Sequence, residues 1–323
     1  MERKGNLLSY RPDIKVVDAT LRDGGLLNDF FFDDDFVKAL YQANIKAGVD
    51  FMEFGYRASK ELFDTNEFGK WKFCDEEAIR EIVGTNDSDM GIAVMADVGR
   101  TEMDDFLPKS ESVIDMVRIA TYIHQIPAAV DMAEKLHDLG YITSVNIMAI
   151  ATAKTEDIVQ ALNMLGESSV DIIYIVDSYG SLYPEEIREL SKLYLEIGEK
   201  YNKKIGIHAH NNQQLAFANT IEATSIGVSY LDATMMGMGR GAGNCTLESL
   251  LGFLKNPRYR IIFTLKFIQD YILPLKEHLV WGYEIPYLVT GLLNQHPRSA
   301  IAAIKANNTN YAEFYKEVWY REA

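Results

Sequence analysis

Short apolar segments rich in β-branched residues alternate along the chain with longer segments whose apolar residues follow a three-and-four spacing. The short segments have the length of buried strands, and eight of them cover residues 14–19, 51–56, 91–96, 116–122, 144–151, 171–176, 205–210 and 230–236. The longer segments are typical of helices buried on one face, most clearly over residues 36–45, 130–139, 158–165 and 187–198. Because strand and helix alternate at a repeat of roughly thirty residues, the pattern predicts a parallel α/β protein.

A closed (β/α)8 barrel is the α/β fold that this number of strands favours. A doubly wound open sheet usually needs fewer strands, and no Gly-x-Gly-x-x-Gly turn follows the first strand here. A barrel of the usual size, about 250 residues, would end near Lys255. We therefore predict a TIM barrel over residues 1–255 and a helical C-terminal extension over residues 256–323, which begins at the break formed by Asn256 and Pro257.

Several polar side chains lie near the C-terminal ends of the predicted strands, where barrel enzymes carry their chemistry. His208 and His210 are two residues apart on one strand, so their rings point to the same face. Asp23 follows the first strand and supplies a hard oxygen ligand. Imidazole and carboxylate ligands together suit a transition metal. The sequence therefore predicts one divalent ion on Asp23, His208 and His210, with Mn²⁺ preferred and Mg²⁺, Zn²⁺ or Co²⁺ also compatible.

Further polar groups are expected around this ion. Arg22 lies at the end of the first strand, and its planar, permanent charge suits a carboxylate or a developing enolate oxygen. The glycine-rich segment 237–244 follows the last strand, and glycine allows backbone N–H groups to approach an anion. We expect Gly241 and Asn244 from this segment, together with Arg118 from the fourth strand, to contact the substrate.

Composition and charge narrow the classes of function. The formal net charge of −15 is not offset by any basic block, which argues against a nucleic-acid partner. Two cysteines in 323 residues indicate a reducing compartment rather than a disulfide scaffold. Residues 1–11 are polar and lack the apolar core of a signal peptide, and no apolar run is long enough to span a bilayer. We expect a cytoplasmic protein without a membrane partner.

Four ordered motifs, at residues 18–24, 117–121, 206–211 and 237–244, resemble the metal-dependent aldolases of the DRE-TIM metallolyase superfamily. This superfamily includes hydroxymethylglutaryl-CoA lyase and the isopropylmalate and homocitrate synthases, and the likeness is closest to 4-hydroxy-2-oxovalerate aldolase. The resemblance implies that Arg22 stabilises the enolate and that the ligands are the three residues already named. It also implies that Asn244 binds the metal or adjoins its ligands. The resemblance also implies that Tyr283, in the helical extension, contributes its side chain to the active site.

The chain departs from the resembled aldolases at the residues that move protons. Leu26 stands where that family has a histidine four residues after the motif arginine, and Tyr122 replaces a second histidine. Tyr122, His124, Tyr283 and a metal-bound water are therefore the candidates for the catalytic base. Asn28, close to the replaced histidine, is expected to position a substrate hydroxyl.

The function that these residues favour is that of a divalent-metal-dependent aldolase. Such a carbon–carbon lyase would cleave or form a 4-hydroxy-2-oxo acid through a metal-stabilised, pyruvate-type enolate, with an α-keto acid and an aldehyde as its small-molecule partners. One alternative is an acyl-CoA-dependent 2-hydroxy acid synthase of the isopropylmalate or homocitrate synthase type. Another is a non-catalytic, metal-binding barrel that serves as a subunit of a complex.

The extension carries more aromatic surface than a short helical segment can bury on itself. Its aromatic residues include Tyr271, Trp281, Tyr283, Tyr287, Tyr311, Tyr315 and Trp319. We expect part of this surface to pack on the barrel or on a second subunit, most simply in a homodimer. In the resembled aldolase the equivalent region docks an aldehyde dehydrogenase. Because the extension diverges here, we expect self-association rather than that partner.

Overall fold

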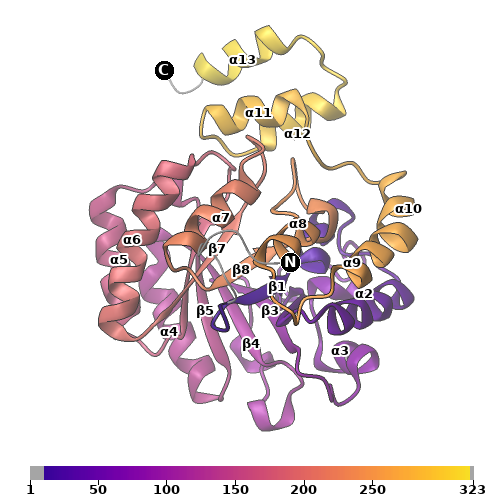
Figure 1. Ribbon diagram of the computed structural model, residues 1–323, viewed down its shortest axis with the longest axis vertical. Helices are drawn as coiled ribbons and strands as arrows, with labels where there is room; N and C mark the ends of the chain where they lie inside the picture. The colour runs from indigo at the N-terminus through magenta and orange to yellow at the C-terminus, as the bar shows by residue number, and fades with distance from the viewer. Residues whose placement is uncertain (1–10, 321–323) are drawn as a thin grey trace.

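The strands of the protein close into a parallel barrel in chain order (Figure 1). The computed structural model describes residues 11–320, so the polar segment 1–10, which bears on the expected absence of a signal peptide, lies outside the described residues. The strands are β1 Lys15–Asp18, β2 Phe51–Tyr56, β3 Gly91–Asp97, β4 Met116–Tyr122, β5 Ile142–Met148, β6 Ile172–Asp177, β7 Lys204–Ala209 and β8 Tyr230–Ala233. Because β1 pairs with β8 as well as with β2, the sheet has no free edge, and the predicted (β/α)8 barrel is confirmed.

Helices surround the barrel and continue into the C-terminal region (Figure 1). Those of the barrel part are α1 Thr20–Gly24, α2 Asp34–Ala47, α3 Glu76–Val83, α4 Ile126–Asp138, α5 Thr155–Glu167, α6 Pro184–Tyr201, α7 Ala216–Ile226 and α8 Leu247–Leu254. Those that follow are α9 Ile261–Phe267, α10 Leu273–Lys276, α11 Ile285–Leu292, α12 Arg298–Lys305 and α13 Tyr311–Tyr320. The predicted helical C-terminal extension is therefore confirmed.

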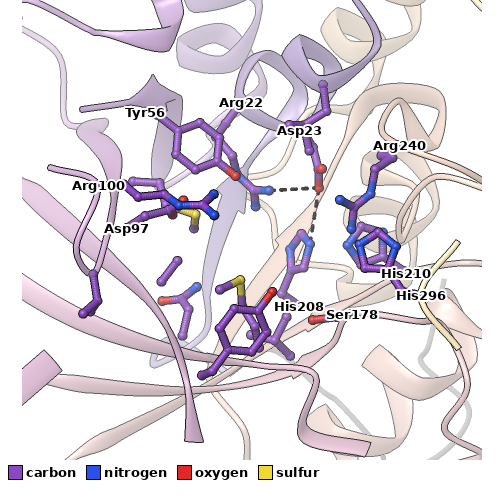
Figure 2. A pocket seen from close by; sticks show the side chains of 18 of the residues that line it. Arg22, Asp23, Tyr56, Asp97, Arg100, Ser178, His208, His210, Arg240 and His296 are labelled. Atoms are coloured by element: carbon purple, nitrogen blue, oxygen red, sulfur yellow. Dashed lines mark ion pairs between the residues drawn. The ribbon is translucent and has the colours of Figure 1, made fainter. Parts of the chain in front are cut away.

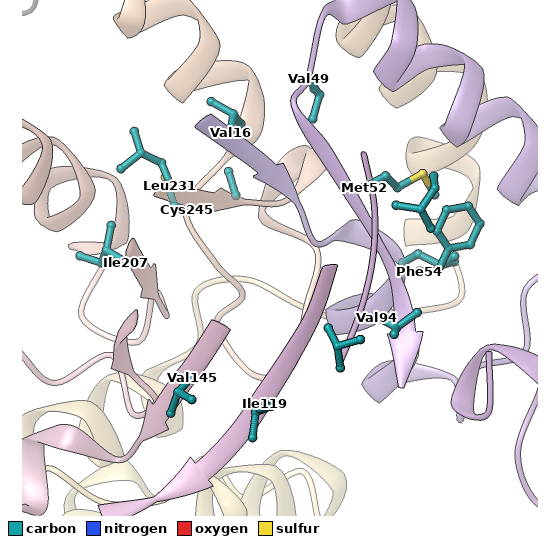
Figure 3. Packing of buried hydrophobic residues seen from close by; sticks show 14 of the residues in the cluster. Val16, Val49, Met52, Phe54, Val94, Ile119, Val145, Ile207, Leu231 and Cys245 are labelled. Carbon is teal, nitrogen blue, oxygen red and sulfur yellow. The ribbon is translucent and has the colours of Figure 1, made fainter. Parts of the chain in front are cut away.

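Alternating residues of the strands enter two different cores. Val16, Met52 and Val94 belong to the large cluster that lies between the strands and the surrounding helices (Figure 3). Their neighbours Val17 and Phe51 belong to a smaller cluster, which faces the barrel interior. The interior positions farther along the strands are polar, as described below, so the barrel has an apolar floor and a charged upper layer.

The chain turns away from the barrel sooner than the apolar pattern suggests. The segment 230–236 was expected to be one strand, but β8 ends at Ala233 and a 3-10 turn covers Met235–Gly237. Met236 within that turn has a φ of 54°, which a strand cannot contain. The motif that holds Arg22 is not a strand end either, because residues 20–24 form the single turn of α1. The apolar run after β8 continues into its turn because Met235 there is also buried.

The C-terminal helices divide into two groups. Helix α9 packs beside α2 on the flank of the barrel, whereas α11, α12 and α13 form a layer across one end of the molecule (Figure 1). This layer has its own small core, formed by Tyr287, Val289, Ala300, Ala303, Phe314 and Val318 and closed by Ala242 from the loop after β8. Within residues 11–320, no helix has both the length and the apolar character needed to cross a membrane.

The aromatic side chains of the extension are partly buried by the chain itself. Trp281 and Tyr287 are 4% and 6% exposed, and the Nε1–H of Trp281 donates a hydrogen bond to the carbonyl of Met236. Five others remain at least 37% exposed, namely Tyr271, Tyr283, Tyr311, Tyr315 and Trp319. The homodimer that this exposed surface suggests stays a prediction.

Gly55 in β2 allows the following loop to lie directly against the strand. A Cβ atom at this position would lie 1.9 Å from the carbonyl oxygen of Trp71, and a backbone atom cannot move aside as a flexible side chain does. We expect Gly55→Ala to lower the free energy of unfolding by about 1–3 kcal/mol, the usual cost of overpacking. Gly252→Ala in α8 is the matched control, because its Cβ would meet nothing closer than 3.8 Å. Urea denaturation should show this control to be neutral or slightly stabilising, and equal effects of the two substitutions would contradict the account.

Candidate active site

A pocket of about 270 Å³ opens at the C-terminal ends of the barrel strands. Arg22 and Asp23 reach it from α1, and His208 and His210 from the end of β7 (Figure 2). Tyr122 at the end of β4 lines it as well, so side chains far apart in sequence surround one cavity. Parallel strands bring their carboxyl ends to one face of a barrel, which explains the convergence.

Asp23, His208 and His210 form the only group of histidine, cysteine and acidic residues within 11–320 whose geometry suits a metal ion. Their ligand atoms all lie within 4.8 Å of one another, and all three side chains are buried. The Nε2 atom of His208 is 3.3 Å from the Oδ2 atom of Asp23. Neither carboxylate oxygen of Asp23 makes a directed hydrogen bond, and neither does His208 Nε2. Buried polar atoms without hydrogen-bond partners are energetically costly, so these atoms are suited to act as ligands of a divalent ion.

Asn244 adjoins this ligand set. It forms an isolated bridge with His210, and its Nδ2–H donates to the carbonyl of Met238 at 3.2 Å. A Cβ on Gly239 would lie 2.2 Å from Asn244 Nδ2 and 3.3 Å from Asp23 Cγ, so the bare glycine lets the amide approach the carboxylate. The buried Oδ1 of Asn244 has no hydrogen-bond partner. This oxygen could therefore act as a further ligand or accept a hydrogen bond from a bound substrate.

Two of the candidate ligands, Asp23 and His208, belong to a closed ring of buried charges that borders the pocket and extends below it. In this ring each side chain contacts the next, in the order Arg22, Glu53, Arg118, Asp232, His208 and Asp23, and Asp23 returns to Arg22. The successive contacts are 2.9, 2.8, 2.5, 3.0, 3.3 and 3.2 Å. Because Asp232 holds the Nδ1 side of His208, the Nε2 side of the ring is directed toward Asp23.

Burial and neighbouring charges set the protonation of the ligands. Burial alone would raise the pKa of Asp23, but Arg22 and the two histidines hold that pKa well below its usual range. Burial also opposes the charged form of His208, yet its close contacts with the carboxylates of Asp23 and Asp232 raise its pKa. Burial lowers the pKa of His210 to about 3. Asp23 is therefore ionised and His210 neutral near pH 7, which are the forms that bind metals.

Arg118 was expected to contact the substrate, but it lies below the pocket. Its side chain is fully buried, pairs with Glu53 and Asp232, and places its guanidinium 4.5 Å from the ring centre of Tyr174. It does not line the cavity. Its position assigns it to the support of His208 and Arg22 rather than to direct contact.

The other expected residues divide between the pocket wall and its surroundings. Tyr122 lines the cavity, is 42% exposed and stacks on His124. Tyr283 is 51% exposed and is not among the lining residues. Asn28 also lies outside the lining and donates its Nδ2–H to the carbonyl of Phe31 at 2.6 Å.

Gly241, another expected contact, has a φ of +70°. It packs near the ring of Tyr287 and does not line the cavity. Its left-handed conformation shapes the loop that carries Arg240, rather than presenting its own backbone to the pocket.

Sequence reasoning missed residues from both the barrel and the extension. Asp232 completes the ring of charges and was not predicted, whereas Glu53 was recognised as a polar residue near a strand end but given no role. A clear signal marked each of them, namely an acidic residue inside an otherwise apolar strand. His296 and Arg298 also line the pocket, but they come from the extension at the start of α12. No spacing in the sequence distinguishes these two from surface residues.

The fold and this site define a (β/α)8-barrel enzyme whose ligand set fits one divalent ion. The HMGL-like family model matches residues 13–268, so the chain belongs to the HMGL-like family, and it is a lyase. The match confirms the resemblance drawn from the sequence motifs.

Named relatives and a solved structure agree with this membership. The chain is 29% identical to an oxaloacetate decarboxylase of Mycobacterium tuberculosis, over 74% of this chain and 69% of that protein. It is 26% identical to a 4-hydroxy-2-oxovalerate aldolase of Pelotomaculum thermopropionicum, over 80% of this chain and 75% of that protein. The crystallised N-terminal domain of a candidate aldolase from Bacteroides vulgatus superimposes with a TM-score of 0.76 at 27% identity, covering 90% of this chain and 96% of that one.

We expect the protein to bind about one divalent ion per chain at Asp23, His208 and His210. Replacing both histidines by alanine removes the two nitrogen donors and should abolish metal retention, measured by elemental analysis after purification without chelator. His137→Ala on the exposed side of α4 is the matched control and should retain the metal. Full occupancy in the double variant would show that these histidines are not ligands.

The ring of charges predicts a large loss of stability when one member is removed. Arg118→Met leaves Glu53 and Asp232 buried without their cation, so the free energy of unfolding should fall by about 3–5 kcal/mol. Arg188→Met is the control, because Arg188 pairs with Glu222 on the exposed surface, where such pairs contribute little to stability. Chemical denaturation measures both, and a loss below about 1 kcal/mol for Arg118→Met would contradict a stabilising ring.

Proposed function

We propose that the protein is a divalent-metal-dependent aldolase, which cleaves or forms a 4-hydroxy-2-oxo acid through a pyruvate-type enolate. The observation that carries this proposal is the position of Arg22 beside the three candidate ligands. Its Nη1 lies 3.2 Å from Asp23 and its Nε 2.9 Å from Glu53, while the side chain lines the pocket. These two contacts fix the plane of the guanidinium beside the residues that would hold the ion.

This arrangement suits chemistry that develops negative charge on an oxygen. A divalent ion held by Asp23, His208 and His210 would supply Lewis acidity toward a 2-oxo acid. Arg22 would donate hydrogen bonds to the oxygen that gains charge as the C3–C4 bond breaks. Because the guanidinium is already held by two acidic residues, it needs no reorganisation during the reaction.

The base has to remove the proton of the 4-hydroxyl group. Of the three residue candidates, Tyr122 lines the pocket, whereas His124 and Tyr283 do not. We therefore assign contact with the 4-hydroxyl group to Tyr122. Acting as its phenolate, Tyr122 would accept the proton during cleavage and become the neutral phenol, which would return the proton during condensation.

A decarboxylase is a second candidate, because loss of carbon dioxide from oxaloacetate leaves the same enolate. The relative from Mycobacterium tuberculosis named as an oxaloacetate decarboxylase favours testing it. Carbon dioxide release from oxaloacetate and aldehyde consumption with pyruvate distinguish the two activities. A synthase would instead consume an acyl-CoA, and a non-catalytic barrel would do none of these.

Enolisation is the step that these lyase activities share. We expect the metal-loaded protein to exchange the methyl protons of pyruvate in heavy water, followed by NMR. Arg22→Lys keeps the charge but loses the planar two-point geometry, so exchange should slow by on the order of a hundredfold or more. Arg188→Lys, on the exposed face of α6, should leave the rate unchanged. No exchange by the wild type would overturn the proposal, and a near-wild-type rate for Arg22→Lys would overturn the role of Arg22.

A further inference from the structure

The wall of the pocket carries more positive charge than a single carboxylate substrate needs. Its cationic residues are Arg22, Lys72, Arg100, Arg240 and Arg298, whereas Asp23 and Asp97 are its only carboxylates among the described residues. The protein as a whole has a formal net charge of −15, so this local excess runs against the composition. A divalent ion would increase the excess further. The charge of the lining therefore indicates an anionic ligand with more than one charged group.

Three of the five cations have partners within the protein. Arg22 pairs with Asp23 and Glu53. The ammonium of Lys72 lies 4.3–5.6 Å from the centres of four aromatic rings, and both Lys72 and Arg100 stabilise the charge of Asp97. These groups are compensated before any ligand arrives.

Arg240 is not compensated in this way. It forms no ion pair and no side-chain hydrogen bond with any residue in the described range 11–320, although its Nε atom is buried. It lies in the glycine-rich loop after β8, and Figure 2 shows it beside His210 and His296, across Asp23 from Arg22. A buried guanidinium nitrogen without an acceptor is costly unless a ligand supplies one.

The extension completes this second cationic group. The backbone N–H of Arg298 donates to His296 Nδ1 at 3.2 Å. Burial, together with the positive charges of Arg240 and Arg298, lowers the pKa of His296 to about 4, which favours the neutral ring near pH 7. Since Nδ1 accepts, the neutral ring carries its proton on Nε2, which becomes a donor. His296, Arg240 and Arg298 thus offer donors around one part of the cavity.

We infer that Arg240, Arg298 and His296 bind a second anionic group of the substrate, a carboxylate or a phosphate on its aldehyde part. This inference rests on the proposed aldolase function. Arg22 and the ligand set would hold the pyruvate part, and the second group would lie across Asp23 from it. Guanidinium groups bind both kinds of oxyanion through paired hydrogen bonds. The cavity of about 270 Å³ restricts the whole substrate to a small metabolite.

The test compares aldehydes that differ in charge. With pyruvate and the metal-loaded protein, we expect kcat/KM for glyoxylate or glyceraldehyde 3-phosphate to exceed that for acetaldehyde by at least about tenfold. Arg240→Met should reduce this ratio by about ten- to a hundredfold, the range for a lost hydrogen bond to a charged group. Arg298→Met should reduce it as well. Arg188→Met is the matched control and should leave the ratio unchanged. Preference for glyoxylate identifies a carboxylate, and preference for the triose phosphate identifies a phosphate.

A binding measurement separates this inference from the proposed function. Inorganic phosphate is titrated into the protein and followed by calorimetry, with the wild type, Arg240→Met and Arg188→Met compared. Weaker binding by Arg240→Met alone supports the anion site even if pyruvate shows no proton exchange, in which case the aldolase proposal fails by itself. Proton exchange with no preference for anionic aldehydes, or equal ratios in wild type and Arg240→Met, would overturn the inference. Unchanged phosphate affinity in Arg240→Met would overturn a phosphate as the second group, and the glyoxylate ratio in this variant then decides for or against a carboxylate.

Discussion

The ring of alternating charges inside the barrel is the constraint on which the site depends. Each member has a neighbour of opposite charge, or a hydrogen-bonding imidazole, on both sides. Glu53 joins Arg22 to Arg118, and Asp232 joins Arg118 to His208. Removing charges from water costs several kcal/mol per ion, so an incomplete ring would be strongly unfavourable. The completed ring therefore has a fixed geometry, because no side chain in it can rotate without leaving a buried charge unpaired.

This geometry explains why the ligand set and Arg22 are already aligned. The Nδ1 atom of His208 is held by Asp232, so its Nε2 atom has one direction left. Arg22 is held between Asp23 and Glu53 in the same way. The apolar cluster below, which contains Val17, forms a floor that excludes water from the ring. The alternation of residues along the strands thus produces both the floor and the charged layer above it.

The sequence predicted those parts of the site that follow from local spacing. Two histidines on one strand must face the same side, and the strand count predicted the closed barrel. It did not predict that Arg118 pairs with Asp232, because 114 residues separate them and only the barrel brings them together. It also placed Arg22 at a strand end, whereas a single helical turn carries it. The position of His296 in the pocket wall depends on how the extension folds over the barrel, and the spacing of apolar residues does not predict that packing.

The contrast between the acidic protein and its basic pocket limits how an anionic substrate can be bound. At physiological ionic strength, charges separated by more than about 8 Å are largely screened, so the overall charge of −15 neither attracts nor strongly repels a ligand at a distance. Affinity must therefore come from contacts made inside the cavity, where screening is weak. Arg240 and Arg298 approach that cavity from two different segments, the loop after β8 and the start of α12. The helical extension consequently belongs to the site, since the second cationic group is incomplete without it.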